Sequence, residues 1–188
     1  TVLTMALRPV SYGLYATFLT PVFVLVADVG GTNARVGWTL DGQSVQDVLV
    51  LRCSDHASLA HILGSYVERM ARSHPGMALR EAVVAIAGYL QGDRLVNANL
   101  PWEVSVARTA DAARLDSLVL INDFGAVAHA IPGVQRQTLV PLLPGQRDSG
   151  MQVPALVLGP GTGLGAALCL DRTGAEVLLT ESGHAALA

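Results

Sequence analysis

The chain has 188 residues, of which 51% are hydrophobic and 14% are charged, and its formal net charge at pH 7 is −3. This length is enough for one full domain and part of a second, and the apolar composition excludes an intrinsically disordered protein. Because the balance is slightly acidic and the basic residues form no cluster, the composition gives little support for a nucleic-acid partner.

Residues 1–21 are predicted to be an N-terminal extension. No residue between Val10 and Ala27 is charged, so a secretory signal or a membrane span has to be weighed. Polar and turn-forming residues interrupt this run, and its most apolar part, residues 22–27, has only the length of a strand. We therefore expect a soluble protein with no membrane partner, in which Met5 is a candidate for the true start.

The first domain is predicted to open with an antiparallel meander of three strands. Each strand is a short apolar run, and tight turns at residues 28–33 and at Asp41-Gly42 separate them. The strands are expected at residues 22–27, 34–40 and 45–52.

An amphipathic helix is predicted after the meander. Apolar residues from Leu59 to Met70 recur at intervals of three and four, which places them on one face of a helix. Ser54 or Asp55 is expected to cap its start, and Pro75-Gly76 ends the region.

The remainder of the first domain is predicted to alternate between strands and helices. The strands are expected at residues 82–87, 95–100 and 117–121, and the helices at residues 104–115 and 123–130. Pro132-Gly133 stops the last helix and marks the expected boundary of a domain covering residues 22–133.

Residues 134–188 are predicted to begin a second, larger α/β domain. After a connector rich in Pro, Gly and Gln, strands are expected at residues 155–158, 166–170 and 176–180. A glycine loop at residues 159–165 joins the first two of them. The strand, glycine turn, strand pattern of the first domain is thus repeated, which indicates a duplicated architecture.

The turn at residues 28–33 has the composition of a phosphate-binding loop. Gly30 and Gly31 let backbone N–H groups approach a ligand closely, and Thr32 and Asn33 add side-chain donors. Asp28, at the end of the strand, could hold Mg²⁺ through water, as nucleotide phosphates require. The alternative is a simple hairpin with a Gly-Gly turn.

The loop at residues 159–165 offers a second phosphate site, to which Gly161, Thr162 and Gly163 would contribute. Its glycine spacing also fits a dinucleotide-binding fold, provided that a helix follows. The turn that begins at Asp171 leaves little room for that helix, so we favour a hairpin.

Two further pairs of polar residues follow predicted strands. Asn122 and Asp123 come at the carboxyl end of a buried strand, where ligands collect in α/β sheets. The carboxylate of Asp123 could accept a proton from an attacking hydroxyl or cap the next helix, and it could do both. Glu181 and His184 could hydrogen-bond sugar hydroxyls.

Four motifs together resemble the bacterial glucokinase family in order and spacing, from about Val22 to the end of the chain. They are Asp28-Val-Gly-Gly-Thr-Asn-Ala-Arg35, Ile121-Asn-Asp-Phe-Gly-Ala-Val-Ala128, Gly159-Pro-Gly-Thr-Gly-Leu-Gly165 and Glu181-Ser-Gly-His184. The resemblance implies an actin-like ATPase (ribonuclease H-like) α/β fold, with a mixed five-stranded sheet, flanking helices and an incomplete second domain. The related repressor and kinase group, which holds zinc through clustered cysteines, fits these motifs less well.

The resemblance implies ATP-dependent phosphorylation of glucose, the first step of glycolysis, in a cytoplasmic homodimer that uses Mg²⁺. Asp123 would be the general base that deprotonates the 6-hydroxyl of glucose. The residues implied as ligands of the sugar hydroxyls are Asn99, Asn122, Glu181 and His184. The two glycine motifs would hold the phosphates of ATP.

Two departures from the family pattern shape the expectations. Ser182 stands where the family has Gly, and the chain stops at Ala188, before the family's adenosine motif. The 188 residues alone are therefore expected to be inactive or nearly so, with the second sheet lacking covering helices. A non-catalytic sugar-binding module and, less readily, a nicotinamide-dependent oxidoreductase stay as alternatives.

Cys53 and Cys169 each lie in an apolar run. Two lone cysteines make no disulfide framework, so both are expected to be buried free thiols, in keeping with a reducing cytoplasm.

Overall fold

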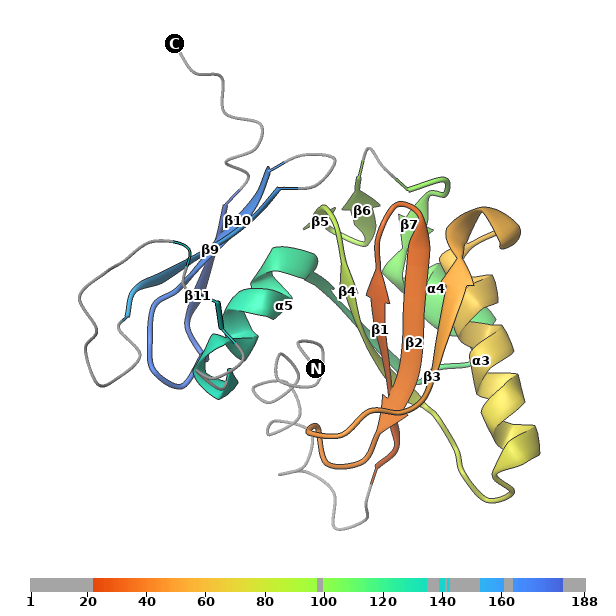
Figure 1. Cartoon of the computed structure of the whole chain (residues 1–188). Helices are drawn as coiled ribbons and strands as arrows, with labels where there is room; N and C mark the ends of the chain where they lie inside the picture. The colour runs from red at the N-terminus through yellow and green to blue at the C-terminus, as the bar shows by residue number, and fades with distance from the viewer. Residues whose placement is uncertain are drawn as a thin grey trace.

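The computed structural model describes residues 22–97, 100–134, 139–140, 142, 153–160 and 164–180. Within these ranges a five-stranded sheet carries two helices on one face and a third helix on the other (Figure 1). A second sheet of three strands lies beyond that third helix. The polypeptide thus forms α/β layers in which one helix lies between two sheets.

The five-stranded sheet has the order β3-β2-β1-β4-β8 and is mixed. The antiparallel meander is confirmed, because β1 pairs with β2 and β2 with β3, whereas β4 and β8 run parallel to β1. The strands are β1 (Val24–Val29), β2 (Asn33–Thr39), β3 (Gln46–Arg52), β4 (Glu81–Ile86) and β8 (Ser117–Asn122).

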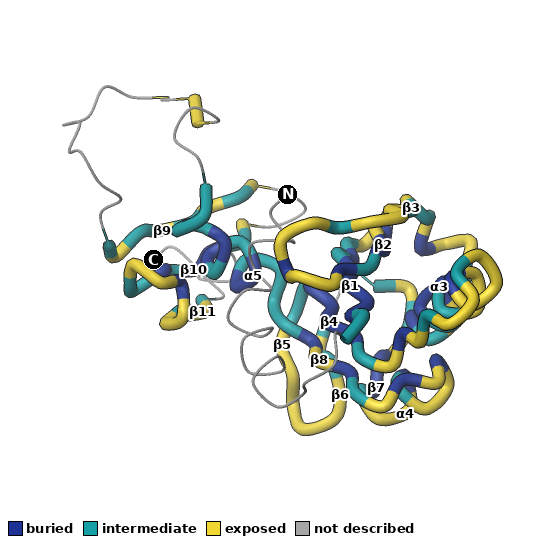
Figure 2. Tube along the Cα trace, turned by 90° about the horizontal axis from the view of Figure 1, so that it is seen from below, coloured by how far each residue is buried: buried dark blue, intermediate teal, exposed yellow. Residues whose placement is uncertain are grey.

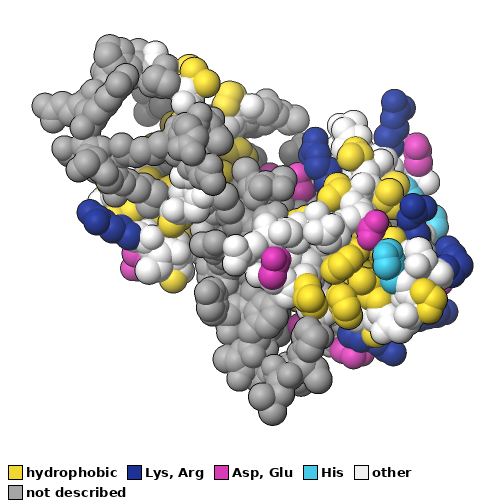
Figure 3. All heavy atoms as spheres, turned by 60° about the horizontal axis from the view of Figure 1, so that its bottom comes forward, with side chains coloured by type: hydrophobic (Ala, Val, Ile, Leu, Met, Phe, Trp, Pro, Cys, Tyr) yellow, Lys and Arg dark blue, Asp and Glu magenta, His cyan; other side chains and the backbone are white. Residues whose placement is uncertain are grey.

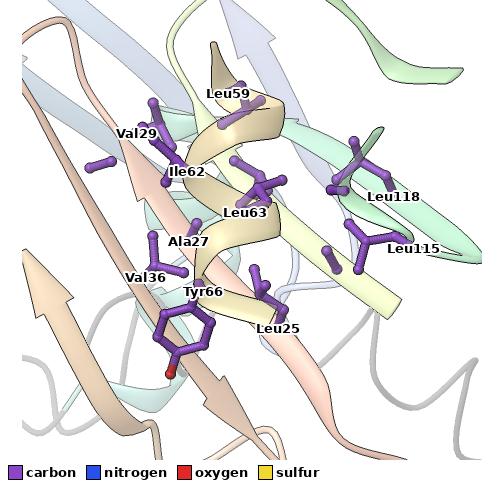
Figure 4. Close-up of a cluster of buried hydrophobic side chains, with 14 of the residues drawn as sticks. Leu25, Ala27, Val29, Val36, Leu59, Ile62, Leu63, Tyr66, Leu115 and Leu118 are labelled. Carbon is purple, nitrogen blue, oxygen red and sulfur yellow. The ribbon is translucent and has the colours of Figure 1, made fainter. Parts of the chain in front are cut away.

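Helix α3 (Leu59–Ser73) and helix α4 (Val106–Ala113) cover the first face of the sheet. Alternate residues of β1 point to this face, as their period of two requires, and they meet the apolar face of α3 (Figure 4). The tube in Figure 2 shows the result, with buried positions along β1 and β4 and exposed positions on the outer side of α3. The five buried α3 residues in this cluster are Leu59, Ile62, Leu63, Tyr66 and Met70.

The cap of α3 differs from the prediction. Ser58 is the N-cap, and its side chain accepts a hydrogen bond from the backbone N–H of His61 at 3.0 Å. Residues Cys53–Asp55, which include both predicted caps, form the short 3₁₀ helix η1 instead.

Gly64→Ala is expected to stabilise the chain by about 0.5–1 kcal/mol, because alanine is the better residue in a helix interior. A Cβ at this position of α3 would meet its nearest neighbour, Ala113 Cα, at 3.6 Å, which is an ordinary contact. Urea denaturation of the 188-residue chain measures the change. A lower free energy of unfolding would contradict the observation that the contact of α3 with α4 leaves room for a methyl group at Gly64.

The predicted strand at residues 95–100 is only partly right, because Leu95 and Val96 lie in a strand and Leu100 does not. The structure has a small antiparallel sheet in this region, with order β5-β6-β7, and Leu100 is not part of it. Its strands are β5 (Tyr89–Gln91), β6 (Arg94–Val96) and β7 (Val104–Ser105). The predicted helix at residues 104–115 is correspondingly shorter, because its first two residues belong to β7.

Helix α5 (Asp123–Ala130) lies against the second face of the five-stranded sheet, where Ala126 and Ala130 pack on Ala85. It is followed by the 3₁₀ helix η2 (Ile131–Gly133). On its other side α5 packs on the second sheet, where Ala128 joins Ala167 and Cys169 in one buried cluster. The same short helix therefore touches both sheets, and its alanines and Gly125 permit the close approach.

The second sheet has the order β11-β10-β9 and is antiparallel throughout. Its strands are β9 (Ala155–Pro160), β10 (Leu164–Cys169) and β11 (Val177–Thr180). The predicted strand, glycine turn, strand pattern is thus repeated, as β1 and β2 are in the first sheet. On the side away from α5, Leu156, Leu158 and Leu178 are exposed. The domain boundary at Gly133 stays a prediction.

Among the helices that the structure describes, none is both long enough and apolar enough to cross a membrane.

Candidate functional site

The first feature of the site is the register of three parallel strands. Asp28 of β1 lies beside Ala85 of β4, and Ala85 lies beside Ile121 of β8. Neighbours in one register row point to the same face of a sheet, and α5 packs on that face through Ala85 and Ile121. Because Asp123 begins α5, the fold brings the carboxylates of Asp28 and Asp123 to one side of the sheet.

Both carboxylates line the same pocket, which has a volume of about 430 Å³. It lies between the β1–β2–β3 meander and the first two turns of α5. Its remaining lining is mainly apolar, with one cation, Arg35. The other lining residues are Val36, Gly37, Val45, Val48, Ala85, Phe124, Ala126 and Val127.

Arg35 pairs with Asp28 across the meander. The two residues are register partners of β1 and β2, and Arg35 Nη1 donates to Asp28 Oδ2 at 3.2 Å. Their side chains are 58% and 42% exposed, so the pair adds little to stability and both groups stay accessible to a ligand. Sequence reasoning included Arg35 in the first motif but gave it no role, because it predicted no register between the two strands of the hairpin.

The other ion pairs of the described residues lie on the surface, away from this pocket. Figure 3 shows acidic and basic side chains interspersed over the described part of one face. The pairs Arg80–Asp116, Arg94–Glu103 and Arg114–Glu68 belong to this set.

The tip of the first glycine hairpin, residues 30–33, joins β1 to β2. The backbone N–H of Gly30 donates to the carbonyl of Asn33 at 3.0 Å, which closes the turn. Gly31, Thr32 and Asn33 are exposed. Cys53 holds the tip in place through two hydrogen bonds. Its backbone N–H donates to the carbonyl of Thr32 at 2.9 Å, and its Sγ donates to the carbonyl of Gly30 at 3.3 Å. The predicted phosphate-binding residues 30–33 thus form a turn that hydrogen bonds fix in place, with an exposed rim made of Gly31, Thr32 and Asn33.

Cys53 and Cys169 are both buried free thiols, as predicted. Burial raises the pKa of each thiol above its ordinary value. Only the thiolate is nucleophilic, so at pH 8 we expect both to react with a disulfide reagent at least about tenfold more slowly than free cysteine. Absorbance of the released thiol measures this rate. Unfolding in urea should make the rates equal, whereas equal rates in the native protein would contradict the burial.

Asn122, rather than Asp123, is the N-cap of α5. Its Oδ1 accepts from the N–H of Gly125 at 2.9 Å, and its Nδ2 donates to the carbonyl of Gly88 at 3.1 Å. The side chain therefore ties the end of β8 both to the helix and to the segment after β4. Sequence reasoning placed the cap one residue later, because Asn and Asp are both good caps.

Asp123 is the first residue of α5, and its Oδ1 accepts from the N–H of Phe124 at 2.9 Å. This bond holds the carboxylate at the start of the helix, where the positive end of the helix dipole favours a negative charge.

The second glycine hairpin is formed by β9 and β10. Residues 164–169 form a strand that pairs with β9 on one side and β11 on the other. The dinucleotide-binding alternative required a helix there, so it is wrong, and with it the nicotinamide-dependent oxidoreductase loses its support.

Six predicted site residues lie outside the described residues, so the structure does not place them. They are Asn99, Gly161, Thr162, Gly163, Glu181 and His184. Those that it does place, Asp28, residues 30–33, Asn122 and Asp123, lie at one edge of the five-stranded sheet or on the adjoining pocket.

The fold places the chain in the actin-like ATPase class, which includes sugar kinases. A glucokinase from an Antarctic psychrotroph matches 88% of this chain and 52% of its own, with a TM-score of 0.64 and 30% identity. A ROK family glucokinase from Streptomyces griseus, solved with glucose and AMPPNP, shares the fold at a TM-score of 0.52 and 18% identity, over 82% of this chain and 46% of its own.

Sequence comparison gives the family. The glucokinase family model matches residues 25–188, and the glucokinase of Paramagnetospirillum magneticum is 38% identical over 168 residues. The chain therefore belongs to the glucokinase family, as its motifs predicted. That match covers 88% of this chain and 50% of the relative, so the chain spans about half the length of the curated relatives it matches.

Proposed function

We propose that this chain forms part of an enzyme that transfers the terminal phosphate of ATP to the 6-hydroxyl of glucose. The observation that carries the proposal is the shared pocket, in which a strand-end carboxylate, Asp28, and a helix-start carboxylate, Asp123, lie beside the first glycine hairpin. Membership of the glucokinase family supports the same reaction and substrate.

In this reaction Asp123 is the general base. A carboxylate that accepts the hydroxyl proton as the oxygen attacks phosphorus contributes roughly 10²–10⁴-fold. The bond from Phe124 N–H occupies one acceptor site of a carboxylate, a group that has about four. Asn122 holds the start of the helix that carries Asp123, and it is also a candidate ligand of a sugar hydroxyl.

The phosphates of ATP are assigned to the two glycine hairpins. At the first, the exposed rim of Gly31, Thr32 and Asn33 offers backbone and side-chain donors. The chain contains no lysine, so the positive charge that these residues can themselves bring to the phosphates comes from arginine side chains and backbone N–H groups. Gly161, Thr162 and Gly163 are proposed for the second hairpin, with Asn99, Glu181 and His184 as sugar ligands.

Mg²⁺ fits this pocket chemically. The ion prefers one or two carboxylates, several waters and substrate phosphates to a full protein cage, and the described residues contain no cluster of three or more acidic, His or Cys side chains. Asp28 would hold it through water, and the ion would neutralise charge on the phosphates. A cytoplasmic location, a role in glycolysis and a homodimer belong to the same proposal.

A coupled assay with glucose, ATP and Mg²⁺ tests the proposal, on a protein of the relatives' full length that contains these residues. Turnover that depends on all three components is expected, and its absence from properly folded protein would refute the proposal. Glucose binding without turnover would favour the non-catalytic sugar-binding alternative. The 188 residues alone are expected to show little or no turnover.

A further inference from the structure

The ring of Phe124 lies on the two glycines at the neck of the second glycine hairpin. Gly159 and Gly165 are register partners across β9 and β10. A Cβ on either glycine would overlap with carbon atoms of the Phe124 ring, and the overlap at Gly165 is the more severe. Both positions therefore require glycine because an aromatic ring, rather than a backbone turn, occupies the space of a side chain.

Phe124 also belongs to the pocket that holds the two carboxylates. It lines that pocket together with Asp123, and its N–H donates to Asp123 Oδ1 at 2.9 Å. On the side of the second sheet it packs against the buried cluster of Ala128, Ala167 and Cys169. One residue thus contacts both the proposed base and the strands that carry the second glycine loop.

We propose that Phe124 is a positioning residue for phosphoryl transfer, whose ring sets the distance between the Asp123 carboxylate and the second glycine hairpin. This inference rests on the proposed function. The proposed base and the proposed phosphate loop lie on different elements, α5 and β9–β10, and the ring is a rigid contact between them. A side chain at Gly165 would have to move the ring or the strand by more than 1 Å to reach an ordinary contact, and a displacement of about 1 Å can already cost about 10²-fold in rate.

The test is a double-mutant cycle between Gly165→Ala and Phe124→Leu in the full-length protein, read by kcat, by the KM for glucose and by thermal unfolding. Gly165→Ala is expected to lower kcat by about 10²-fold and to leave the KM for glucose within about threefold. Leu lacks the Cε2 and Cζ atoms, which account for two of the three closest overlaps at Gly165, and its δ carbons can rotate away from the new methyl group. The double variant should therefore recover at least about tenfold in kcat over Gly165→Ala.

Gly64→Ala is the matched control, because it makes the same change where a Cβ meets only ordinary contacts, and its kcat should equal that of the wild type. If Gly165→Ala lowers thermal stability but not kcat, or if Phe124→Leu restores nothing, the positioning role is overturned and Phe124 is a packing residue alone. Should Gly165→Ala fail to fold, Phe124→Leu by itself carries the test. A kcat at least about fivefold lower, with the KM for glucose kept, supports the role, and an unchanged kcat overturns it.

An inactive wild type would overturn the proposed function, and the positioning role with it. An active wild type that fails the double-mutant cycle would overturn the positioning role alone.

Discussion

Asp123→Asn is expected to lower kcat for glucose phosphorylation by about 10²–10⁴-fold and to leave the affinity for glucose within about threefold. The amide keeps the size of the carboxylate and can still accept the Phe124 N–H bond through its oxygen. It cannot accept the proton of the attacking hydroxyl, so the loss should fall on the chemical step. A coupled assay measures kcat, and calorimetric titration measures glucose affinity.

Asp116→Asn is the control for this change. Asp116 is an exposed carboxylate with a surface partner, Arg80, at 3.7 Å, and it is not among the residues that line the pocket. Its substitution should leave kcat unchanged. Normal turnover by Asp123→Asn would remove the general-base role. If Asp123→Asn instead loses its affinity for glucose, Asp123 is mainly a sugar ligand.

Leu63→Ala is expected to lower the free energy of unfolding by about 2–5 kcal/mol, which is a large part of the stability of a domain. Leu63 is fully buried in the cluster that joins α3 to the five-stranded sheet, among β1 and β4 side chains on a packed face (Figure 4). Truncation removes apolar contacts and leaves a cavity that a sheet cannot readily close. Urea denaturation of the 188-residue chain measures the loss.

Glu68→Ala, on the exposed side of the same helix, is the control. Its partner Arg114 lies at 3.9 Å, and an exposed pair of this kind contributes at most about 1 kcal/mol. A loss below about 1 kcal/mol in Leu63→Ala would show that α3 does not pack on the sheet as described.

The strands and the long helix could be predicted because their apolar periodicity is strong. β1 begins with four consecutive buried apolar residues, Val24 to Ala27, and the apolar residues of α3 repeat over three turns. The start of α3 was harder, since Ser54, Asp55 and Ser58 are all good caps and only tertiary packing of Leu59 selects the last. The β5–β6 hairpin was missed because its strands have only three residues each and all three residues of β5 are exposed, so no alternation or long apolar run marks them.

The site could be predicted in part for the same reason. Asp28 lies at the end of β1 and Asp123 comes directly after β8, so a sheet in which these strands run parallel brings both to one edge. The contact of Phe124 with Gly159 and Gly165 depends on how α5 docks on a sheet that comes about 35 residues later. No local pattern in a single sequence carries that information.

The three parallel strands end in one row, formed by Val29, Ile86 and Asn122. Inserting a single residue into β4 would turn its inward side chains to the opposite face and would offset Asn122 from the first hairpin. The connections before β4 and before β8 enter the sheet at the amino ends of these strands. A change in the number of residues in an exposed connection there does not disturb the row at the carboxyl ends. Orthologous genes should therefore gain and lose codons at residues 74–78, before the buried Leu79, and almost never within the strands.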